Sequence, residues 1–190
     1  MTDVIHNPIS AIQLAGCLKL PNPSAESREL VRAVAAAYYG SYYYLDAPLY
    51  LQSADLKQQL IKEPLLQDTL KETENMSAVI TGIGSKSSLP ITNPIFSPYI
   101  SDRDYKQLDH CLGSIYGYIL DKHGQIADID LNQKVVAAPI ENILKADHRI
   151  AVVYGRHKAN ITYQALKNHL INEILTDTDT ALNLLDLAKS

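Results

Sequence analysis

The chain has few of the residues that mark disulfide-rich, metal-binding or nucleic-acid-binding proteins. It has no tryptophan, one phenylalanine, two cysteines and a formal net charge of -4. Cys17 and Cys111 are too few for a disulfide framework or a zinc ligand set, which favours a reducing, cytoplasmic setting. The negative net charge provides no general basic field, so the chain is not expected to bind DNA by itself.

Long hydrophobic runs are absent as well. No apolar stretch approaches the length of a membrane span, and the first residues, MTDVIHNPIS, lack the apolar centre of a signal peptide. We therefore expect no membrane partner. The composition is ordinary for a globular protein, with 46% hydrophobic and 20% charged residues over 190 positions. That length predicts a single domain, residues 1–190, with a sizeable core.

Short apolar runs alternate with helical patterns along the chain, which favours an α/β sheet. Strands are expected within 9–15, 42–45, 77–81, 113–120, 131–137, 150–153 and 171–175. Helices are expected from Ser24, over 53–73 with a break at Pro64, over 102–110, over 139–145, after Gly155 and in the last stretch, TDTDTALNLLDLA. A turn at Gly124 is expected to form a hairpin. The predicted fold class is therefore α/β.

Four glycines each follow a predicted strand: Gly16, Gly82, Gly84 and Gly155. In an open parallel sheet such strand ends share one edge, where ligands bind in a crevice. Glycine permits close approach of backbone N–H groups to an anion, and a helix N-terminus adds partial positive charge. Lys158 stands at such a helix start, so the combination predicts a phosphate site. The alternative is a set of ordinary loop glycines and a solvated lysine.

Catalytic and metal-binding patterns find little support. The stretch GIGS lacks the rest of a dinucleotide fingerprint, no G-x-S-x-G elbow is present, and the six histidines do not pair at metal-ligand spacing. Cys17 is interpreted as a small loop residue, with a nucleophile as the alternative, and Cys111 as a core residue. Asp177 and Asp179 are interpreted as helix-capping residues, with a cation site as the alternative. No metal or cofactor is therefore expected.

Tyrosines are dense after the first predicted helix. Tyr38, Tyr39, Tyr42, Tyr43 and Tyr44 fall within seven positions. Alternation along a strand places Tyr42 and Tyr44 on one face and Tyr43 on the other. The arrangement fits a subunit interface and, equally well, a tyrosine-rich edge of the core.

Several stretches are informative when their order and spacing are taken together. They are ISAIQLAGC, SRELVRAVA, YLDAPLYLQSADLKQQLIKEPLLQDTL, SAVITGIGS, YIS (99–101), LGSIYGYILDKHGQIADIDL, RIAVVYGRHKANITYQAL and INEILTDTDTALNLL. With them, nearly the whole chain resembles the sugar-binding, or effector-binding, domain of the SorC family of bacterial transcriptional regulators. This family is also described as DeoR-like.

The resemblance implies a Rossmann-like, mostly parallel sheet flanked by helices, similar to the fold of sugar-phosphate isomerases and deaminases. It also implies binding of a phosphorylated sugar effector without turnover, in a homodimer or homotetramer. In the family a lysine in the loop after a late strand contacts the ligand, and Lys158 occupies that position beside Gly155. Gly16 and Cys17 match a loop that lines the pocket. Gly82 and Gly84 belong to the same implied site.

Two positions depart from the family pattern. Gly113 is followed by Ser114, where the family tends to have an acidic residue that binds sugar hydroxyls. Ser114 would still bind a hydroxyl, but without a charge. Tyr154 stands where the family usually has a second glycine, and it adds bulk near the site.

Family members also carry an N-terminal helix-turn-helix and an early βαβ segment with a phosphate-holding loop. This chain starts after both, so we expect an incomplete effector domain that reaches DNA only through a helix-turn-helix outside it. Without the early segment the sheet is expected to expose an edge, which favours dimerisation. The leading hypothesis is therefore effector binding and oligomerisation. The alternatives are an enzyme like the sugar-phosphate isomerases and deaminases, and a truncated remnant that binds no effector.

Overall fold

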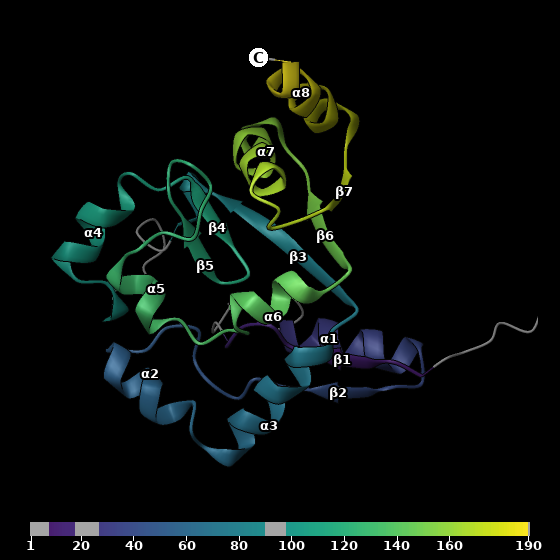
Figure 1. The fold of residues 1–190 in the computed structure, drawn as a ribbon, viewed down its shortest axis with the longest axis vertical. Coiled ribbons are helices and arrows are strands. Elements are labelled where there is room, and N and C mark those ends of the chain that lie inside the picture. The colour runs from purple at the N-terminus through teal and green to yellow at the C-terminus, as the bar shows by residue number, and fades with distance from the viewer. Residues whose placement is uncertain (1–7, 18–26, 90–97, 190) are drawn as a thin grey trace, which may run out of the picture.

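Two runs rich in β-branched and small residues form the centre of the fold in a computed structural model, which describes residues 8–17, 27–89 and 98–189. They belong to a five-stranded sheet of order β5-β4-β3-β6-β7 (Figure 1). Its strands are β3 (Ala78–Ser85), β4 (Gly113–Ile115), β5 (Tyr118–Leu120), β6 (His148–Val153) and β7 (Glu173–Thr176). β6 is parallel to β3 and β7, whereas β4 is antiparallel to β3 and β5. Every strand of this sheet except β4 therefore points the same way, which confirms the expected mostly parallel α/β sheet.

Apart from α5, the α-helices lie close to where the sequence predicts them. The α-helices are α1 (Ser27–Ala37), α2 (Ala54–Leu60), α3 (Pro64–Glu72), α4 (Asp102–Leu108), α5 (Asp130–Lys134), α6 (Ile140–Lys145), α7 (Ala159–Lys167) and α8 (Thr178–Lys189). Short 3-10 helices include η2 (Thr73–Asn75), η3 (Lys86–Ser88) and η6 (Arg156–Lys158). The expected break is confirmed, because Pro64 opens α3 at a position that needs no backbone N–H. The predicted helix start at Ser24 lies outside the described residues.

The two faces of the main sheet differ. On one face, Ala151 and Val153 are buried in a core cluster to which α6 and α7 contribute. On the other face, Ile80, Val152 and Leu175 are 62%, 48% and 65% exposed. Alternation of side chains along each strand produces this division. An apolar sheet face is therefore open in the described part of the chain.

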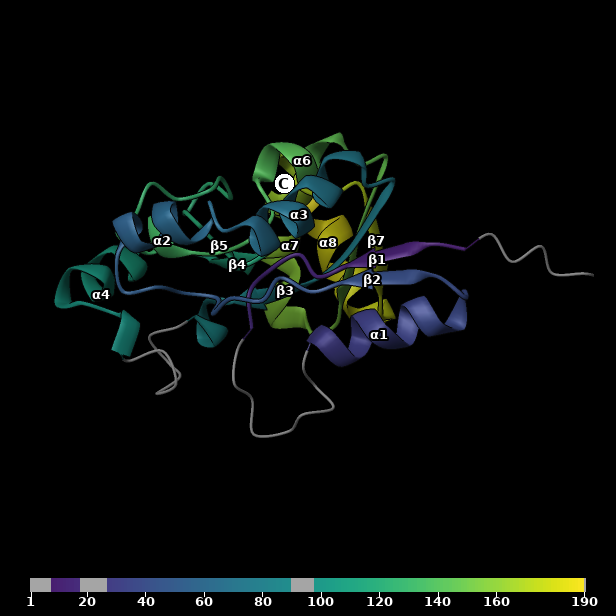
Figure 2. The same cartoon turned by 90° about the horizontal axis from the view of Figure 1, so that it is seen from below.

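A second, smaller sheet precedes the main one in the sequence. β1 (Ser10–Ile12) is parallel to β2 (Ser41–Tyr43), and α1 connects the two and packs against both. Figure 2 shows α1 lying along this pair on one side. The predicted strand at 9–15 is longer than β1, and its far end survives as a single bridge between Ala15 and Ala137.

The predicted strand at 131–137 is wrong. Its first half is α5, and its second half forms only isolated bridges. The Asn132 amide accepts a hydrogen bond from Ile119 N at 2.8 Å and donates to Ala127 O at 2.7 Å. A buried amide thus fixes this segment against β5, where the apolar pattern indicated strand pairing.

The expected turn at Gly124 is confirmed. Its N–H donates to Asp121 O at 3.0 Å, and Leu120 and Ile126 bridge across the turn. A second, tighter turn at Tyr116-Gly117 joins β4 to β5 and was not predicted. Both of its residues have positive φ, 58° and 89°, as a two-residue hairpin turn requires.

Buried groups hold the segment around α4. Asp104 is fully buried, and its Oδ2 accepts hydrogen bonds at 2.8 Å from Lys134 Nζ and from Ser101. Burial by itself would raise the pKa of Asp104, but the hydrogen bonds from Lys134 and Ser101 hold its pKa below the ordinary value. Cys111 is 5% exposed, which confirms the expected core position.

The tyrosine cluster surrounds β2. The rings of Tyr42 and Tyr44 lie on one face, with centroids 5.0 Å apart, as alternation predicts. Tyr38, Tyr39 and Tyr42 are about half exposed or more. Whether this surface is a subunit interface stays a prediction.

Candidate functional site

The open face of the main sheet forms one wall of a groove, and α1 with the segment after β1 forms the other. The groove has a volume of about 400 Å³, within the range of small-molecule sites. We name it the sheet groove, and its lining comes from residues 12–17, 27, 30, 31, 49, 80–82, 84 and 114–117. Five of the eight predicted binding residues line it: Gly16, Cys17, Gly82, Gly84 and Ser114.

Gly82 and Gly84 shape the floor of the groove. The expectation that they follow a strand is wrong, because both lie inside β3 on its open face. A Cβ on Gly82 would meet no atom within 4 Å, so the missing side chain leaves open space. A Cβ on Gly84 would lie 2.6 Å from Ser88 Oγ and 2.7 Å from Ser114 Oγ. The two glycines therefore keep one stretch of floor empty and let two hydroxyls approach the backbone.

Hydroxyl groups gather at the end of β3. Ser114, on β4, pairs with Gly84 across the strands. Ser88 donates a hydrogen bond to Ser85 O at 2.8 Å, and the Ser85 and Ser87 hydroxyls are 3.0 Å apart. Ser114 is the member of this group that lines the groove.

Gln13 organises the opposite wall and was missed by the sequence analysis. Its side chain is 2% exposed, and it donates to Ala15 O at 2.8 Å and to Ser27 Oγ at 3.0 Å. It also accepts from Leu45 N at 3.3 Å. The amide thus joins the segment after β1, the start of α1 and the segment after β2. The signal was the glutamine inside the otherwise apolar run AIQLAG.

Cys17 lies beside a guanidinium group. Arg28 Nε donates to Cys17 Sγ at 3.0 Å, and Arg28 also pairs with Asp46 and stacks over the Tyr44 ring at 5.2 Å. Burial alone would lower the pKa of Arg28, but its contacts with Cys17 and Asp46 raise it. Among the described residues, the side chains that bond to Cys17 are this guanidinium and the Gln13 amide, and neither accepts a proton as a general base. The surroundings fit the interpretation of Cys17 as a loop residue.

Lys158 and Gly155 lie at the sheet edge beside the groove and are not part of its lining. Gly155 follows β6, and Lys158 is the half-buried N-cap residue of α7, as predicted. Lys158 N donates to Gly155 O at 2.9 Å, and Lys158 O accepts from Thr162 Oγ at 2.8 Å. Helix η6, which carries Lys158, packs against β3. The lysine therefore stands next to the strand that supplies the floor of the groove.

Gly113 is also outside the lining. It pairs with Ser85, and a Cβ at this position would collide with Gly84 O and lie 2.6 Å from Ile161 Cδ1. Gly113 therefore allows α7 and β3 to approach each other.

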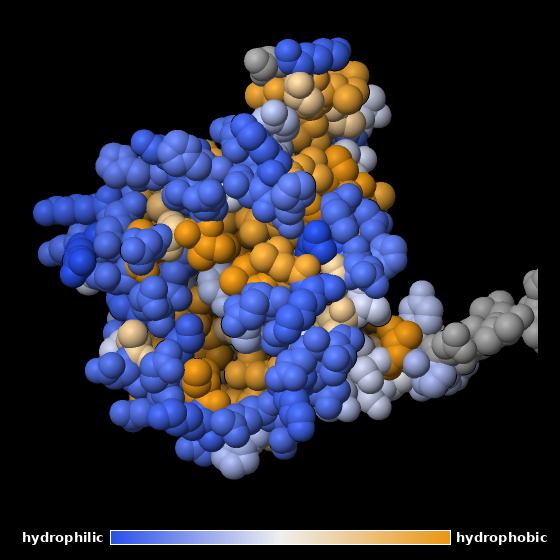
Figure 3. Space-filling view, in the orientation of Figure 1, coloured by the Kyte–Doolittle hydropathy of each residue, from blue (hydrophilic) through white to orange (hydrophobic). Residues whose placement is uncertain are grey.

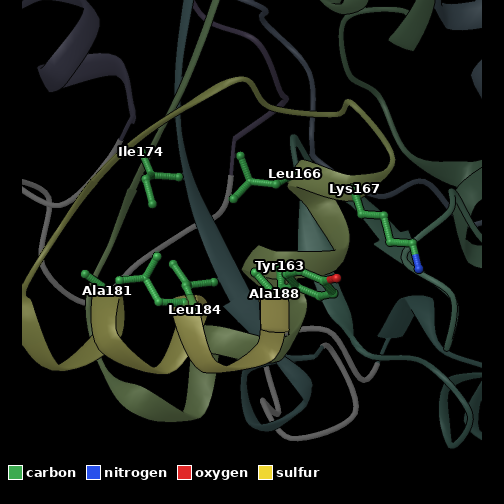
Figure 4. Close-up of a pocket in the computed structure, with 8 residues that line it drawn as sticks. Tyr163, Leu166, Lys167, Ile174, Ala181, Leu184 and Ala188 are labelled. Atoms are coloured by element: carbon green, nitrogen blue, oxygen red, sulfur yellow. The ribbon is translucent and has the colours of Figure 1, made fainter. Parts of the chain in front are cut away.

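A second hollow of about 590 Å³ lies between α7 and α8, and we name it the helix hollow. It is lined by Tyr163, Leu166, Lys167, Ile174, Ala181, Leu184, Leu185 and Ala188. Figure 4 shows Leu166, Ile174 and Leu184 pointing into it, while the Lys167 ammonium points away. Figure 3 shows hydrophobic side chains gathered over α8 at the top of the molecule. This hollow offers apolar contact and few hydrogen bonds.

The described ranges contain no helix with both the length and the apolar character that a membrane span requires. They also contain no group of three or more His, Cys, Asp or Glu side chains placed to hold a metal ion. Asp177 caps α8 by accepting a hydrogen bond from Thr180 N at 2.8 Å, which confirms the capping interpretation for Asp177.

A mostly parallel sheet with a glycine-floored groove on its open face defines an α/β domain that binds a small ligand. Comparison with known families agrees with this class. The family model described as "Putative sugar-binding domain" matches residues 1–186. The chain belongs to this family of sugar-binding domains.

Relatives of known identity are regulators. The chain is 27% identical over 147 residues to the transcriptional regulator LsrR of Enterobacter sp. strain 638, covering 76% of this chain and 46% of that protein. It is 31% identical over 144 residues to LsrR of Escherichia coli O139:H28, covering 74% and 45%. The chain thus spans a little under half the length of these relatives.

Solved structures show the same fold. A transcriptional regulator from Streptococcus pneumoniae TIGR4 matches with a TM-score of 0.84 and 18% identity, over 95% of this chain and 69% of that one. The full-length sorbitol operon regulator SorC from Klebsiella pneumoniae matches with a TM-score of 0.82 and 20% identity, over 93% and 57%. These likenesses support the fold.

Proposed function

We propose that the chain is the effector-binding part of a transcriptional regulator and binds a phosphorylated sugar in the sheet groove without turning it over. The observation that carries the proposal is that predicted binding residues converge on one groove. Gly16, Cys17, Gly82, Gly84 and Ser114 come from separate segments of the chain and line one groove. The family adds that the ligand class is a sugar.

The groove suits the hydroxyl end of such a ligand. Ser114 offers a hydroxyl that both donates and accepts. Gly82 leaves room for a ring or an open chain against the strand. Specificity for a polyol needs a small number of polar groups placed around an otherwise apolar wall, and the groove has that composition.

The phosphate end is assigned to Lys158 and the backbone at the start of α7. A helix N-terminus presents N–H groups and a partial positive charge, and a lysine there adds a full charge. Gly155 lets the chain turn from β6 toward this helix. The phosphate would sit at the sheet edge, and the sugar would extend into the groove past Gly84.

Binding would regulate by shifting an equilibrium between conformations or assemblies. We propose residues 1–190 as one effector domain of a homodimer or homotetramer, with DNA contacted through a separate helix-turn-helix of a longer protein. An enzymatic role has little support, because Cys17 contacts a guanidinium and an amide and no base.

The test is calorimetry with sugar phosphates and with the matching unphosphorylated sugars. The panel is ribose 5-phosphate, glucose 6-phosphate, fructose 1-phosphate, fructose 6-phosphate and dihydroxyacetone phosphate. We expect one of them to bind and to bind at least about tenfold more weakly to Lys158→Ala, since a charge-assisted hydrogen bond is lost. Lys167→Ala, at the other end of α7, is the control and should bind normally. Absence of binding across the panel, or turnover of a bound sugar phosphate, would overturn the proposal.

A further inference from the structure

The loop that carries Lys158 is tied to the first turn of α8. Gly155 N–H lies 2.9 Å from Thr180 Oγ1 and 3.1 Å from Asp177 Oδ2, so one donor is shared by two acceptors. Thr180 Oγ1 in turn donates to Asp177 Oδ2 at 2.9 Å, and Asp177 Oδ1 accepts Thr180 N–H at 2.8 Å. Three groups from two distant parts of the sequence therefore form a closed hydrogen-bonded ring.

This ring holds the Gly155 peptide, which directly precedes the short helix that carries Lys158. Gly155 has φ +104°, a conformation that is open to glycine and strained for residues with a side chain. Its N–H bonds to α8, and its C=O accepts Lys158 N–H at 2.9 Å. Helix η6 also packs against α8. Contacts with α8 therefore fix the direction in which the backbone runs from β6 to Lys158.

Both the burial of Thr180 and the ionisation of Asp177 strengthen the hydrogen bonds of the ring. Thr180 is fully buried, so its hydroxyl is shielded from competing water. The Thr180 backbone N–H lowers the pKa of Asp177, and the Thr180 hydroxyl and Gly155 N–H lower it further. Asp177 is therefore an anion at neutral pH, and an ionised acceptor makes the stronger hydrogen bond.

We propose that Asp177 and Thr180 are positioning residues of the ligand site: they hold the Gly155 peptide, and through it they place Lys158 for contact with the phosphate of the effector. The inference rests on the proposed function and adds α8 to the site. It also connects α8 to the ligand. If binding shifts the Lys158 loop, the hydrogen bonds of the Gly155 N–H transmit that shift to the first turn of α8.

The discriminating variant is Asp177→Asn. Asparagine caps helices about as well as aspartate, so the bond from Thr180 N–H to Oδ1 is kept. The amide NH₂ then replaces Oδ2 and faces the Gly155 N–H, donor against donor. The cap of α8 is preserved while one of the two hydrogen bonds that tie the loop to it is lost, and the bond to Thr180 Oγ1 remains. Thr180→Val removes the other acceptor at nearly constant shape and provides an independent second variant.

The first measurement needs no ligand. By NMR, hydrogen exchange of the Gly155 amide should be about three- to tenfold faster in Asp177→Asn, the range expected for one lost hydrogen bond. Amides 181–189 should exchange as before. Asp179→Asn is the matched control, with the same charge change in the same helical turn and no bond from its side chain to Gly155. Unchanged Gly155 exchange, or faster exchange throughout α8, would overturn the inference even if the protein binds phosphate.

The second measurement uses inorganic phosphate as the probe, titrated by NMR. Asp177→Asn and Thr180→Val should each weaken phosphate binding about three- to tenfold, and neither should weaken it further when Lys158 is already alanine. Equal losses with and without Lys158 would overturn the positioning role, since they indicate a merely structural effect. If Gly155 responds but the protein binds neither phosphate nor any sugar phosphate, the proposed function fails and the ligand role of Asp177 fails with it.

Discussion

The sheet groove and the helix hollow differ in chemistry more than in size. The groove, at about 400 Å³, is bounded by a strand floor with two glycines, a serine hydroxyl and a wall organised by the buried Gln13 amide. The hollow, at about 590 Å³, is bounded by the facing aliphatic side chains of two helices. The larger hollow is therefore the poorer site for a polyol, because a buried hydroxyl without a partner costs free energy. What favours the sheet groove as the candidate site is its hydrogen-bonding groups and its access to the backbone, not its volume.

Because of this difference, we expect substitutions in the helix hollow to lower stability without weakening ligand binding, and substitutions in the sheet groove to do the reverse. The largest effect on stability should come from Leu184→Ala in the helix hollow. Leu184 is 7% exposed, and removing its buried methyl groups should cost about 2 kcal/mol and lower Tm by about 5 °C. Sugar-phosphate affinity should stay within about twofold at temperatures where the variant is folded.

Leu182→Ala is the matched control on the same helix. Leu182 is 55% exposed, so its loss should change the free energy of unfolding by less than about 0.5 kcal/mol. Thermal unfolding followed by circular dichroism measures both variants. A loss of ligand affinity in Leu184→Ala as large as its loss of stability would break the separation between the two regions.

The largest effect on binding alone should come from Gly82→Val. A Cβ here meets no atom within 4 Å in the free protein, and valine favours strands, so stability should hold or rise slightly. The added side chain fills the floor of the groove, and sugar-phosphate affinity should fall at least about tenfold. Calorimetry together with thermal unfolding checks both statements.

Val152→Ile adds bulk to the neighbouring strand on the same open face. Val152 pairs with Gly82 but does not line the groove, so this variant should bind normally. Unaltered binding by Gly82→Val would remove the sheet groove from consideration as the ligand site.

The smallest effect should come from Ser114→Ala. Loss of one neutral hydrogen bond to a ligand hydroxyl should weaken binding about fivefold and leave Tm nearly unchanged. The comparison variant is Ser88→Ala, since the Ser88 hydroxyl already donates to Ser85 O and should contribute little to binding. Calorimetric affinities that are equal for the wild type and Ser114→Ala would show that the ligand hydroxyls are held elsewhere.

Much of the fold could be predicted because periodicity reports burial on one side of an element. The apolar runs at 77–81 and 150–153 located β3 and β6, although β3 continues to Ser85, and local residue chemistry located the break at Pro64 and the cap at Asp177. The prediction for 131–137 failed because five of its seven residues are buried without a clear alternation, and burial without periodicity does not separate a helix from a strand. There the side chain of Asn132 decided the structure, through bonds to residues that the pattern could not identify as neighbours.

The candidate site was predictable in part. Glycines after apolar runs pointed to the groove, although Gly82 and Gly84 proved to lie inside β3. The partners of the site were not predictable, because Gln13 and Arg28 act through contacts with segments that are distant in the sequence. The ring between Gly155 and α8 was hidden for the same reason.

The two walls of the groove also differ in the sequence separation between the strands that pair in each wall. Ser10 pairs with Ser41, so one wall closes a short loop, whereas Ala78 pairs with His148 and closes a much longer one. Loop-closure entropy rises with that separation. A ligand that bridges both walls binds only when both loops are closed, and by mass action it stabilises the state in which both are closed. An effector bound in the groove would therefore act as a non-covalent cross-link between the early and late parts of the chain.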